Sequence, residues 1–593
     1  MKNTLLFILI SSISLTIVAQ SFIMNPSGRQ HVQLLNGKWN AIIDLYSRGE
    51  SLKFYQNRQP LLKTDFIEYS FKNGLRLDVP SDFNSQLPEL KYYEGNVWYQ
   101  RNFNVKKNCD KRQFIYFAAV SYQAAVWLNG VEIGRHEGGF TPFQFDVSDV
   151  LKNGDNDLIV MVNNNRREDG IPAMNFDWWN YGGITRDVFF IETPKIFIKD
   201  YILQLKKGSR NQLLGYVQLK GATSAQQVEV LIPELKINTK LNTDNEGLAV
   251  IDINAKPQLW EPATPKLYEV KFITGNDTIT DEIGFRTIET KGNDILLNGK
   301  SIFLKGVNFH EEIPQRMGRA YSDADASMIL SEVKALGCNF ARTAHYPQNE
   351  HVLRMAEKMG ILIWEEIPVW QGIKFTNEVV MKKAQSMLQE MIYRDKNRAS
   401  IIIWSIQNET APSTSRNKML SGLVQMTHHL DSTRLIGGAF DNLKFENVTN
   451  TFTLNDSVAN LMDVVGINKY MGWYMPFPVA PEQIKWKVAL NKPLIISEFG
   501  CEALYGQHGE ADVAYSWSEE YQEEIYRKNL IMFKSIPNLR GTSPWVLFDF
   551  RSPTRCHPLN QDGWNRKGLI SDKGQRKKAW YIMKEFYNQV LVK

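Results

Sequence analysis

Two glutamates, Glu409 and Glu498, each close a largely apolar run of residues. The first follows 401–408 and the second follows 493–497. Apolar, β-branched runs without alternation are typical of strands buried on both faces of a parallel sheet. In a barrel of parallel strands, the carboxyl ends of the strands carry the catalytic residues. Two carboxylates at that edge are what glycoside hydrolysis requires, whereas either acid alone could simply end a strand.

The C-terminal half contains the elements that must position these acids. From Asp294 onward, apolar strands alternate with amphipathic helices, which indicates repeated βα units. Helices are predicted between the strands, for example over 326–336 and 352–358, which stop at Gly337 and Gly360. The eight predicted strands cover 301–309, 339–345, 361–366, 401–408, 435–439, 464–470, 494–499 and 543–550. Residues 290–593 are therefore predicted to form a catalytic (β/α)8 TIM barrel.

The N-terminal half has a different pattern, in which short alternating runs are broken by Gly, Asn, Asp and Pro. Residues 20–194 are predicted to form a jelly-roll β-sandwich of the sugar-binding type. Within it, Asn129-Gly130 separates two short runs and predicts a tight hairpin. Residues 195–289 continue the β pattern in a smaller unit, which we interpret as an immunoglobulin-like β-sandwich.

The predicted barrel also suggests a mechanism for the two glutamates. Strands four and seven end opposite each other across a barrel mouth, which could place the carboxylates about 5 Å apart, the spacing of retaining enzymes. One group would act as acid and then as base, with a raised pKa, and the other would stay ionised and attack the anomeric carbon. The spacing alone leaves open which glutamate has which role.

Composition limits the other classes of function. The chain has 593 residues, which suggests three or four domains, and its net charge of +5 is too small to indicate nucleic-acid binding. Aromatic residues make up 12%, including 15 Trp, which suits sugar stacking although most Trp fill cores. The spacing of Cys and His suggests no metal site, and no cofactor is expected.

The first residues have the pattern of a signal peptide. Met1-Lys2-Asn3 precedes an apolar run that ends at Ala19, so we expect residues 1–19 to be cleaved. The run is too short for a comfortable transmembrane helix, which predicts an exported, periplasmic or secreted protein without membrane insertion. Of the four cysteines, Cys501 and Cys556 fall in predicted loops on one face of the barrel. Free thiols are favoured, and a disulfide between them is the alternative.

Four segments together resemble glycoside hydrolase family 2: 404–409, 496–500, 306–311 and 342–347. The resemblance covers essentially the whole mature chain, and that family has a jelly roll, an immunoglobulin-like sandwich and a barrel in this order. It implies that Glu409 is the acid/base and Glu498 the nucleophile. It also implies that Asn408 hydrogen-bonds the sugar 2-hydroxyl.

Within this family the chain resembles the β-glucuronidases. The segment 175–184 is similar to a sandwich loop that contributes an Asp to the glucuronidase pocket, here Asp177. The segment 468–474 is similar to one whose tyrosines line the glucuronidase site, here Tyr470 and Tyr474. Asn565 and Lys567 match the Asn-x-Lys pair that grips the glucuronate carboxylate. An ammonium and an amide in a dry pocket favour that charge and disfavour a neutral sugar. The alternative for this pair is a solvated surface loop.

Other residues have two interpretations each. Trp545 is a stacking platform or a core residue, and His310 and His345 bind the sugar or brace the glutamates. Arg342 keeps Glu498 ionised or forms a structural ion pair. The resemblance to family 2 implies that Glu365 and Glu366 are structural or support the residues that contact the substrate.

The leading hypothesis is a retaining exo-acting enzyme that removes terminal β-D-glucuronic acid from a carbohydrate substrate. A β-galacturonidase or β-galactosidase is the nearest alternative. The orientation of the C4 hydroxyl separates glucuronate from galacturonate, and no residue identified from the sequence distinguishes the two orientations. A catalytically dead carbohydrate-binding protein is disfavoured by the presence of both Glu409 and Glu498. The sequence leaves the oligomeric state open, with a homo-oligomer as one alternative.

Overall fold

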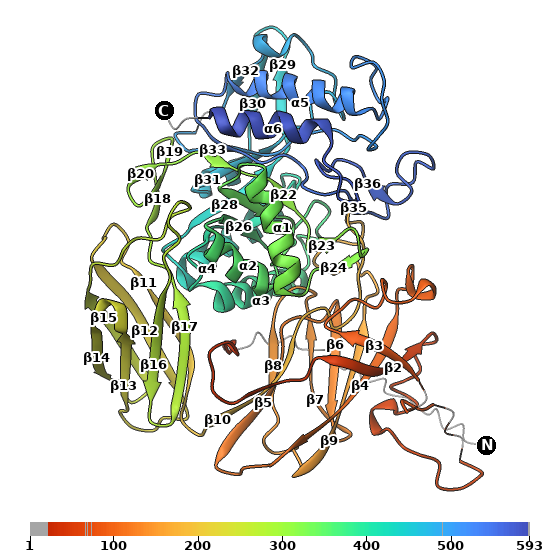
Figure 1. The fold of residues 1–593 in the computed structure, drawn as a ribbon, viewed down its shortest axis with the longest axis vertical. Coiled ribbons are helices and arrows are strands. Elements are labelled where there is room, and N and C mark those ends of the chain that lie inside the picture. Colours follow the sequence, from red (N-terminus) through yellow and green to blue (C-terminus); the bar gives the residue numbers. More distant parts are fainter. Residues whose placement is uncertain (1–21, 66, 68, 73, 489, 591–593) are drawn as a thin grey trace, which may run out of the picture.

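The first part of the chain forms a two-sheet sandwich of antiparallel strands. In a computed structural model, which describes residues 22–590 except 66, 68, 73 and 489, this unit lies at the lower right of Figure 1. The predicted signal peptide, residues 1–19, falls outside the described residues. One sheet has the order β1 (Val32–Leu34), β10 (Val188–Pro194), β5 (Lys111–Phe117), β8 (Phe143–Asp146). The other has β3 (Leu75–Val79), β2 (Gly37–Asp44), β4 (Asn96–Val105), β9 (Gly154–Asn163), β6 (Gln123–Leu128), β7 (Val131–Glu137).

The hairpin predicted at Asn129-Gly130 is confirmed. Strands β6 and β7 pair antiparallel up to Leu128 and Val131, directly across the turn. Asn129 has a φ of 54° and Gly130 a φ of 82°. Two positive φ angles are what a two-residue turn with the natural strand twist requires, and Asn and Gly adopt them at least cost.

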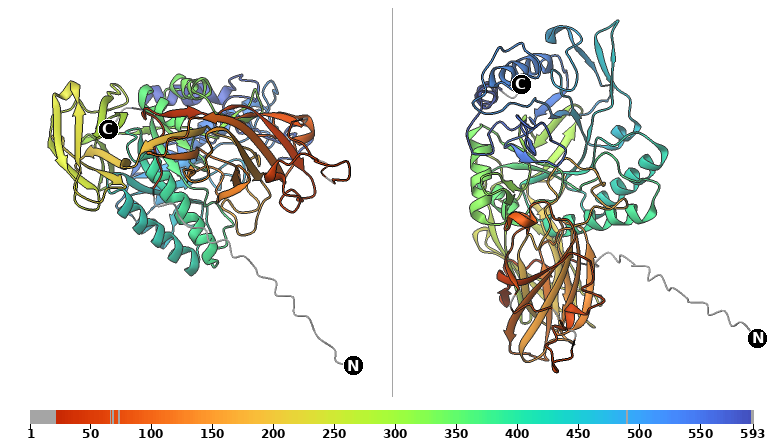
Figure 2. Two further views of the ribbon diagram at one scale, coloured as in Figure 1. Left: turned by 90° about the horizontal axis from the view of Figure 1, so that it is seen from below. Right: turned by 90° about the vertical axis from the view of Figure 1, so that its right-hand side faces the viewer.

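A smaller sandwich follows, drawn in yellow in Figures 1 and 2. Its sheets have the orders β11 (Phe197–Leu205), β12 (Gln212–Lys220), β15 (Leu248–Asn254) and β14 (Ile237–Asn242), β13 (Gln227–Ile232), β16 (Tyr268–Thr274), β17 (Asp277–Ile283). Alternate residues of β13, Val228, Val230 and Ile232, are fully buried, as a strand with one face on the core demands. A short sheet of β18 (Ile288–Lys291), β19 (Asp294–Leu297) and β20 (Lys300–Ser301) then leads to the barrel.

The C-terminal unit is a closed ring of parallel strands, so the predicted fold class is confirmed. The ring consists of β21 (Leu304–Lys305), β22 (Asn308–Phe309), β25 (Phe340–Thr343), β26 (Leu362–Glu366), β27 (Ile401–Asn408), β28 (Leu435–Phe440), β31 (Val464–Asn468), β33 (Leu494–Glu498) and β34 (Leu539–Thr542). The first strand is split into β21 and β22. Because β21 pairs with β34 and β22 pairs with β25, the two halves close the ring.

The last barrel strand is not where the sequence pattern predicted it. It was predicted at 543–550, but β34 ends at Thr542, and the apolar residues that follow pack in the barrel mouth. Pro544 has no amide hydrogen to donate to a ladder, which disfavours a continuous strand there. The true strand, Leu-Arg-Gly-Thr, carries little β-forming signal of its own.

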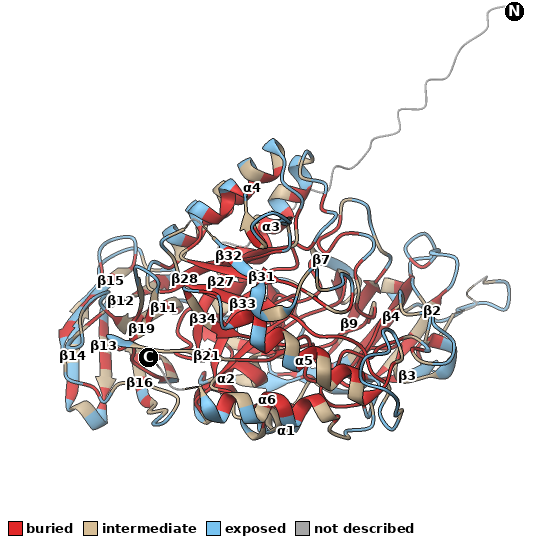
Figure 3. Cartoon of the chain, turned by 90° about the horizontal axis from the view of Figure 1, so that it is seen from above, coloured by how far each residue is buried: buried red, intermediate tan, exposed pale blue. Residues whose placement is uncertain are grey.

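Helices cover the outside of the ring, with their exposed residues facing outward in Figure 3. They are α1 (Asp323–Ala335), α2 (Glu350–Met359), α3 (Glu378–Asp395), α4 (Thr414–Leu430), α5 (Glu519–Phe533) and α6 (Lys578–Gln589). Helix α2 ends at Gly360, whose φ of 70° is the left-handed cap that glycine favours. No helix in the described part of the chain is both long and apolar enough to cross a membrane.

Two of the predicted intervening helices are replaced by other structure. After β28 and β31 the chain forms a three-stranded sheet of β29 (Leu443–Glu446), β30 (Thr451–Leu454) and β32 (Lys485–Lys487) and two short 3-10 turns. The apolar residues here alternate with polar ones, and Phe445, Phe452 and Trp486 pack together across the three strands. This period of two favours strands over a helix.

Buried charged contacts hold the jelly roll against the barrel. Arg186 donates to Glu311 at 2.5 Å and to the Pro347 carbonyl at 2.6 Å, and all three lie close to the barrel mouth. Arg186 is almost fully buried, so the fork of its guanidinium fixes the angle between the two units. As a result, the sandwich loop that contains Asp177 lies at the mouth of the barrel.

Candidate active site

Glu498 ends strand β33 and is held by two strong donors. Its Oε1 accepts a hydrogen bond from Arg342 Nη1 at 2.6 Å, and its Oε2 accepts one from Tyr470 OH at 2.6 Å. The glutamate is 4% exposed and lines a cavity at the carboxyl ends of the strands. The guanidinium and the phenol thus fix both carboxylate oxygens at the place where a nucleophile would be needed.

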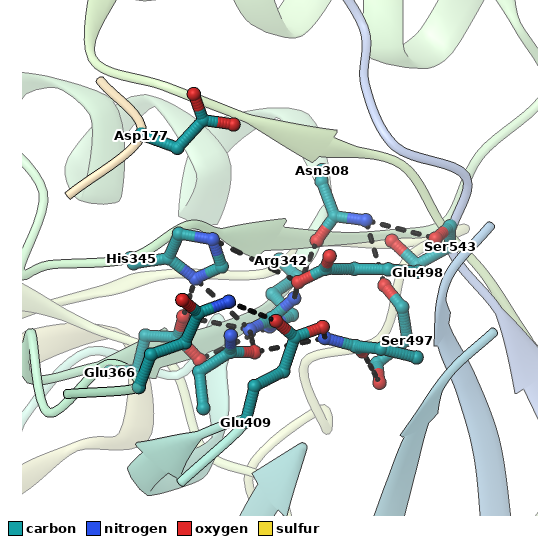
Figure 4. A network of polar contacts seen from close by, with 12 residues as sticks. Asp177, Asn308, Arg342, His345, Glu366, Glu409, Ser497, Glu498 and Ser543 are labelled. Carbon is teal, nitrogen blue, oxygen red and sulfur yellow. Dashed lines mark hydrogen bonds and ion pairs between the residues drawn. The ribbon is translucent and has the colours of Figure 1, made fainter. Parts of the chain in front are cut away.

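Arg342 lies at the centre of the network drawn in Figure 4 and is fully buried. Besides Glu498, it donates to Glu366 Oε1 at 2.9 Å and to Asn408 Oδ1 at 2.7 Å. Burial disfavours its charge, but Glu366 and Glu498 outweigh that effect and raise the pKa of Arg342. Glu366 therefore pairs with the arginine behind the site, as expected of a structural acid.

Glu409 follows strand β27 in a left-handed backbone conformation, with a φ of 51°. Its Oε1 accepts from Asn468 Nδ2 at 2.8 Å and its Oε2 from Gln371 Nε2 at 2.9 Å. Burial, followed by the charges of Glu498 and Asp441, raises the pKa of Glu409 to about 8. A carboxyl group with this pKa is protonated at neutral pH and can serve as a general acid.

The side chain of Asn408 is oriented by the same network. Its Oδ1 accepts from Arg342 and from Asn468 Nδ2, the latter at 3.1 Å. Within the described part of the chain, its Nδ2 has no hydrogen-bond partner although it is buried. Since the oxygen is occupied, the amide can only donate to a further group, such as the sugar hydroxyl that the resemblance assigns to it.

The cavity between the glutamates and the jelly roll has a volume of about 580 Å³. Side chains from the sandwich loop form one wall, and the barrel loops form the others. This volume accommodates a sugar and part of its substituent. The lining residues are Asn175, Asp177, Trp178, His345, Trp370, Gln371, Glu409, Asp441, Asn468, Lys469, Tyr470, Tyr474, Met475, Glu498, Trp545, Thr554, Arg555 and Lys567.

One part of the cavity wall is strongly cationic. Lys567 is 1% exposed, and its Nζ donates to Tyr474 OH at 2.8 Å and lies 3.4 Å from Glu502 Oε1. Arg555 pairs with Asp177. Burial is the largest single effect on Asp177 and raises its pKa, but the charge of Arg555 and hydrogen bonds from Arg555, Ser552 and Thr554 together lower it. The Nε of Arg555 has no partner within the described residues. The two cations could therefore face one anionic ligand group.

Asn565 does not line the cavity as Lys567 does. Its Nδ2 donates to Asp177 Oδ2 at 3.3 Å, and its Oδ1 accepts from the backbone amide of Lys567. It thus supports Asp177 and the lysine loop from behind. The interpretation as a solvated surface loop is wrong for this pair, because Asn565 and Lys567 are both buried.

Aromatic rings form the remaining wall. Trp545 lines the cavity and stacks on His345, with ring centres 4.8 Å apart and planes 17° apart. His310 lies behind Trp545, with its centre 5.3 Å from the Trp545 ring, and is outside the cavity lining. Burial lowers the pKa of His310 well below its usual range. The predicted sugar contact of His310 is thus replaced by packing of a neutral ring.

Among the cavity residues not singled out from the sequence are Gln371, Asp441, Lys469 and Arg555. Each lies in a loop that follows a barrel strand. Lys469 falls within the segment 468–474, where only the tyrosines were given a role, and the other three lie outside the motifs. Their position after strand ends was the one available signal. The four cysteines are all unpaired, with Cys501 buried and Cys556 exposed.

Comparison with known families agrees with this architecture. The model of the glycosyl hydrolases family 2 TIM barrel domain matches residues 288–592, more than half of the chain. The chain belongs to glycosyl hydrolase family 2. The sugar binding domain of the same family matches 63–194, and a third family 2 model matches 200–286. Among the described residues, no cluster of His, Cys, Asp and Glu could hold a metal ion.

Relatives within family 2 span nearly the whole chain. The β-glucuronidase of Streptococcus agalactiae serotype V is 29% identical over 94% of this chain and 97% of its own length. The β-glucuronidase of Rattus norvegicus is 28% identical, with coverages of 94% and 91%. A solved β-glucuronidase of an uncultured Clostridium species has a TM-score of 0.82 at 28% identity, covering 97% of this chain and all of the other. The β-glucuronidase of Ruminococcus gnavus in complex with D-glucuronic acid has a TM-score of 0.80 at 26% identity, with coverages of 96% and 99%.

Proposed function

We propose that this family 2 glycoside hydrolase is a retaining exo-β-glucuronidase, which removes terminal β-D-glucuronic acid from glycosides or oligosaccharides. The observation that carries the proposal is the buried ammonium of Lys567 in the wall of the catalytic cavity. A lysine there favours a sugar with a carboxylate at C6 over a neutral hexose. The β-glucuronidases among its relatives, one of them solved with D-glucuronic acid, give independent support.

The geometry assigns a role to each glutamate. Glu409 has the raised pKa and donates its proton to the glycosidic oxygen as the bond to the leaving group breaks. Glu498, held by Arg342 and Tyr470, attacks the anomeric carbon and forms a covalent glycosyl-enzyme. The ionised Glu409 then takes a proton from water, which attacks the same carbon and releases the sugar with its configuration retained.

The sugar itself is held by the surrounding wall. The amide of Asn408 is available to the 2-hydroxyl, and Trp545 offers an apolar ring face to the sugar. Lys567 and Arg555 meet the carboxylate, while Asp177 can accept hydrogen bonds from hydroxyl groups. These contacts come from the sandwich and from the barrel, so the glycone pocket requires both units.

The direct test compares three chromogenic substrates with one aglycone: the β-glucuronide, the β-galacturonide and the β-galactoside. We expect the glucuronide to have the highest kcat/KM. A preference for the galacturonide would assign the enzyme to the alternative uronic acid. A preference for the galactoside would refute carboxylate recognition altogether.

We further propose that the protein is exported to the periplasm or beyond, with residues 1–19 removed. The charged N-terminus and the apolar run to Ala19 support this proposal. Mass spectrometry of the protein from the native exported fraction tests it. An intact N-terminus in that fraction would overturn the proposal.

A further inference from the structure

Lys469 places a second buried ammonium in the catalytic cavity. The residue follows strand β31, and its backbone amide donates to the Glu498 carbonyl at 2.8 Å, which fixes its position. It is 5% exposed and lines the cavity. In the part of the chain that the structure describes, the hydrogen-bond acceptor of its Nζ is Met475 Sδ, at 3.2 Å. The same Nζ lies 4.6 Å from the centre of the Phe452 ring.

This environment differs from that of the other cavity cations. Arg555 and Lys567 in the cavity wall, and Arg342 behind it, each have a carboxylate oxygen within 4.0 Å. Lys469 has none at that distance among the described residues, and a thioether is a weak acceptor that uses one of its three donors. Burial lowers the pKa of Lys469, and the charge of Asp441, which acts from beyond 4.0 Å, offsets part of that effect. Burying an ammonium without a carboxylate in direct contact is costly, and an anion that enters the cavity would remove much of that cost.

Lys469 lies beside the proton donor and not in the wall assigned to the glycone. Its neighbour Asn468 donates directly to Glu409, whereas Lys567 and Arg555 form the wall with Asp177. Because Glu409 must reach the glycosidic oxygen, the departing group passes along the wall next to Glu409. Gln371, Asp441, Lys469 and Met475 line the cavity on this side. Gln371 donates to Glu409, the charge of Asp441 acts on Glu409, and Lys469 donates to Met475.

We propose that Lys469 binds an acidic substituent on the leaving group, a carboxylate or a sulfate. The preferred substrates would then be glucuronides of acidic aglycones, such as a neighbouring acidic sugar. This inference rests on the proposed β-glucuronidase function and extends it to the other side of the scissile bond. Asp441 lines the same wall and repels an anion, so it limits the preference that Lys469 creates.

The test uses nitrophenyl β-glucuronides that differ at one ring position, which carries a carboxylate, a sulfonate or a neutral carboxamide. Lys469→Met removes the charge but suits the Phe452 and Met475 surroundings, so the fold should persist. We expect the preference for the anionic over the neutral aglycone, as a ratio of kcat/KM, to fall by about ten- to a hundredfold. This is the range for losing a hydrogen bond to a charged group. The anion with the larger response identifies the class of group that the subsite accepts.

Two further variants sharpen the test. Asp441→Asn, assayed at pH 6, should raise the preference for the anionic aglycone, because it removes the opposing charge. Lys485→Met removes an exposed lysine from the neighbouring strand β32 and should leave the ratio unchanged. An unchanged ratio in Lys469→Met, with the thermal midpoint preserved, would overturn the inference. Failure of the wild-type protein to cleave any of these glucuronides would instead overturn the proposed function.

Discussion

The proposed role of Lys567 gives the prediction that an experiment can most readily refute. Lys567→Met keeps the volume of the side chain and removes the ammonium from a site that is 1% exposed. Losing one partner of a buried charge pair costs about 2–5 kcal/mol. Two features favour the lower end of this range: Lys567 already shares its charge with Glu502, 3.4 Å away, and Arg555 remains in the same wall. At about 1.4 kcal/mol per tenfold, a loss of roughly 2–3 kcal/mol lowers kcat/KM for a glucuronide by about 30- to 150-fold.

The fold should survive this change because Glu502 keeps other partners. Its carboxylate accepts from Gln561 Nε2 at 3.0 Å and from the Arg566 amide at 3.0 Å. The assay compares kcat/KM for the glucuronide and for the matching neutral glucoside, whose activity should fall far less. Lys573→Met, in an exposed loop, is the control for loss of a positive charge. Equal losses on both substrates would refute carboxylate recognition by Lys567.

Three further predictions concern the glutamates. Glu498→Gln should abolish turnover in a folded protein, and residual activity above about a per cent, measured with an aryl glucuronide, would contradict its role as nucleophile. Glu409→Gln should retain cleavage of substrates with good leaving groups, and added azide should yield a β-glycosyl azide. An α-glycosyl azide, identified by NMR, would contradict the role of Glu409 as the acid/base of a retaining enzyme. The wild-type kcat/KM should fall as the pH rises through about 8, because the acid step needs protonated Glu409. Asp441→Asn should move this alkaline fall in kcat/KM to lower pH, because the charge of Asp441 raises the pKa of Glu409. An alkaline fall that stays at the same pH would argue against Glu409 as the titrating group.

The local patterns of the chain determined its architecture. Runs with a period of two predicted the sandwiches, unbroken apolar runs predicted the barrel strands, and Asn129-Gly130 predicted its hairpin. These features follow from short-range physics, namely backbone propensity and which faces are buried. The predictions from local patterns failed at the last barrel strand, Leu539–Thr542, where the β-forming signal is weak. They also failed after β28 and β31, where strands occupy positions usually taken by helices.

The candidate site likewise has some features that the sequence predicts and others that only the tertiary structure sets. The positions of Glu409 and Glu498 at strand ends follow from the sequence, because parallel strands bring their carboxyl ends to one edge. The raised pKa of Glu409 depends on its burial and on the nearby charges of Glu498 and Asp441, which only the folded chain sets. Arg555 lies in a loop without a motif, and Lys469 lies in a motif that assigns it no role, so only the tertiary structure shows that both line the cavity. Desolvation and pairing of charge are properties of three-dimensional neighbours, and the order of residues along the chain does not specify them.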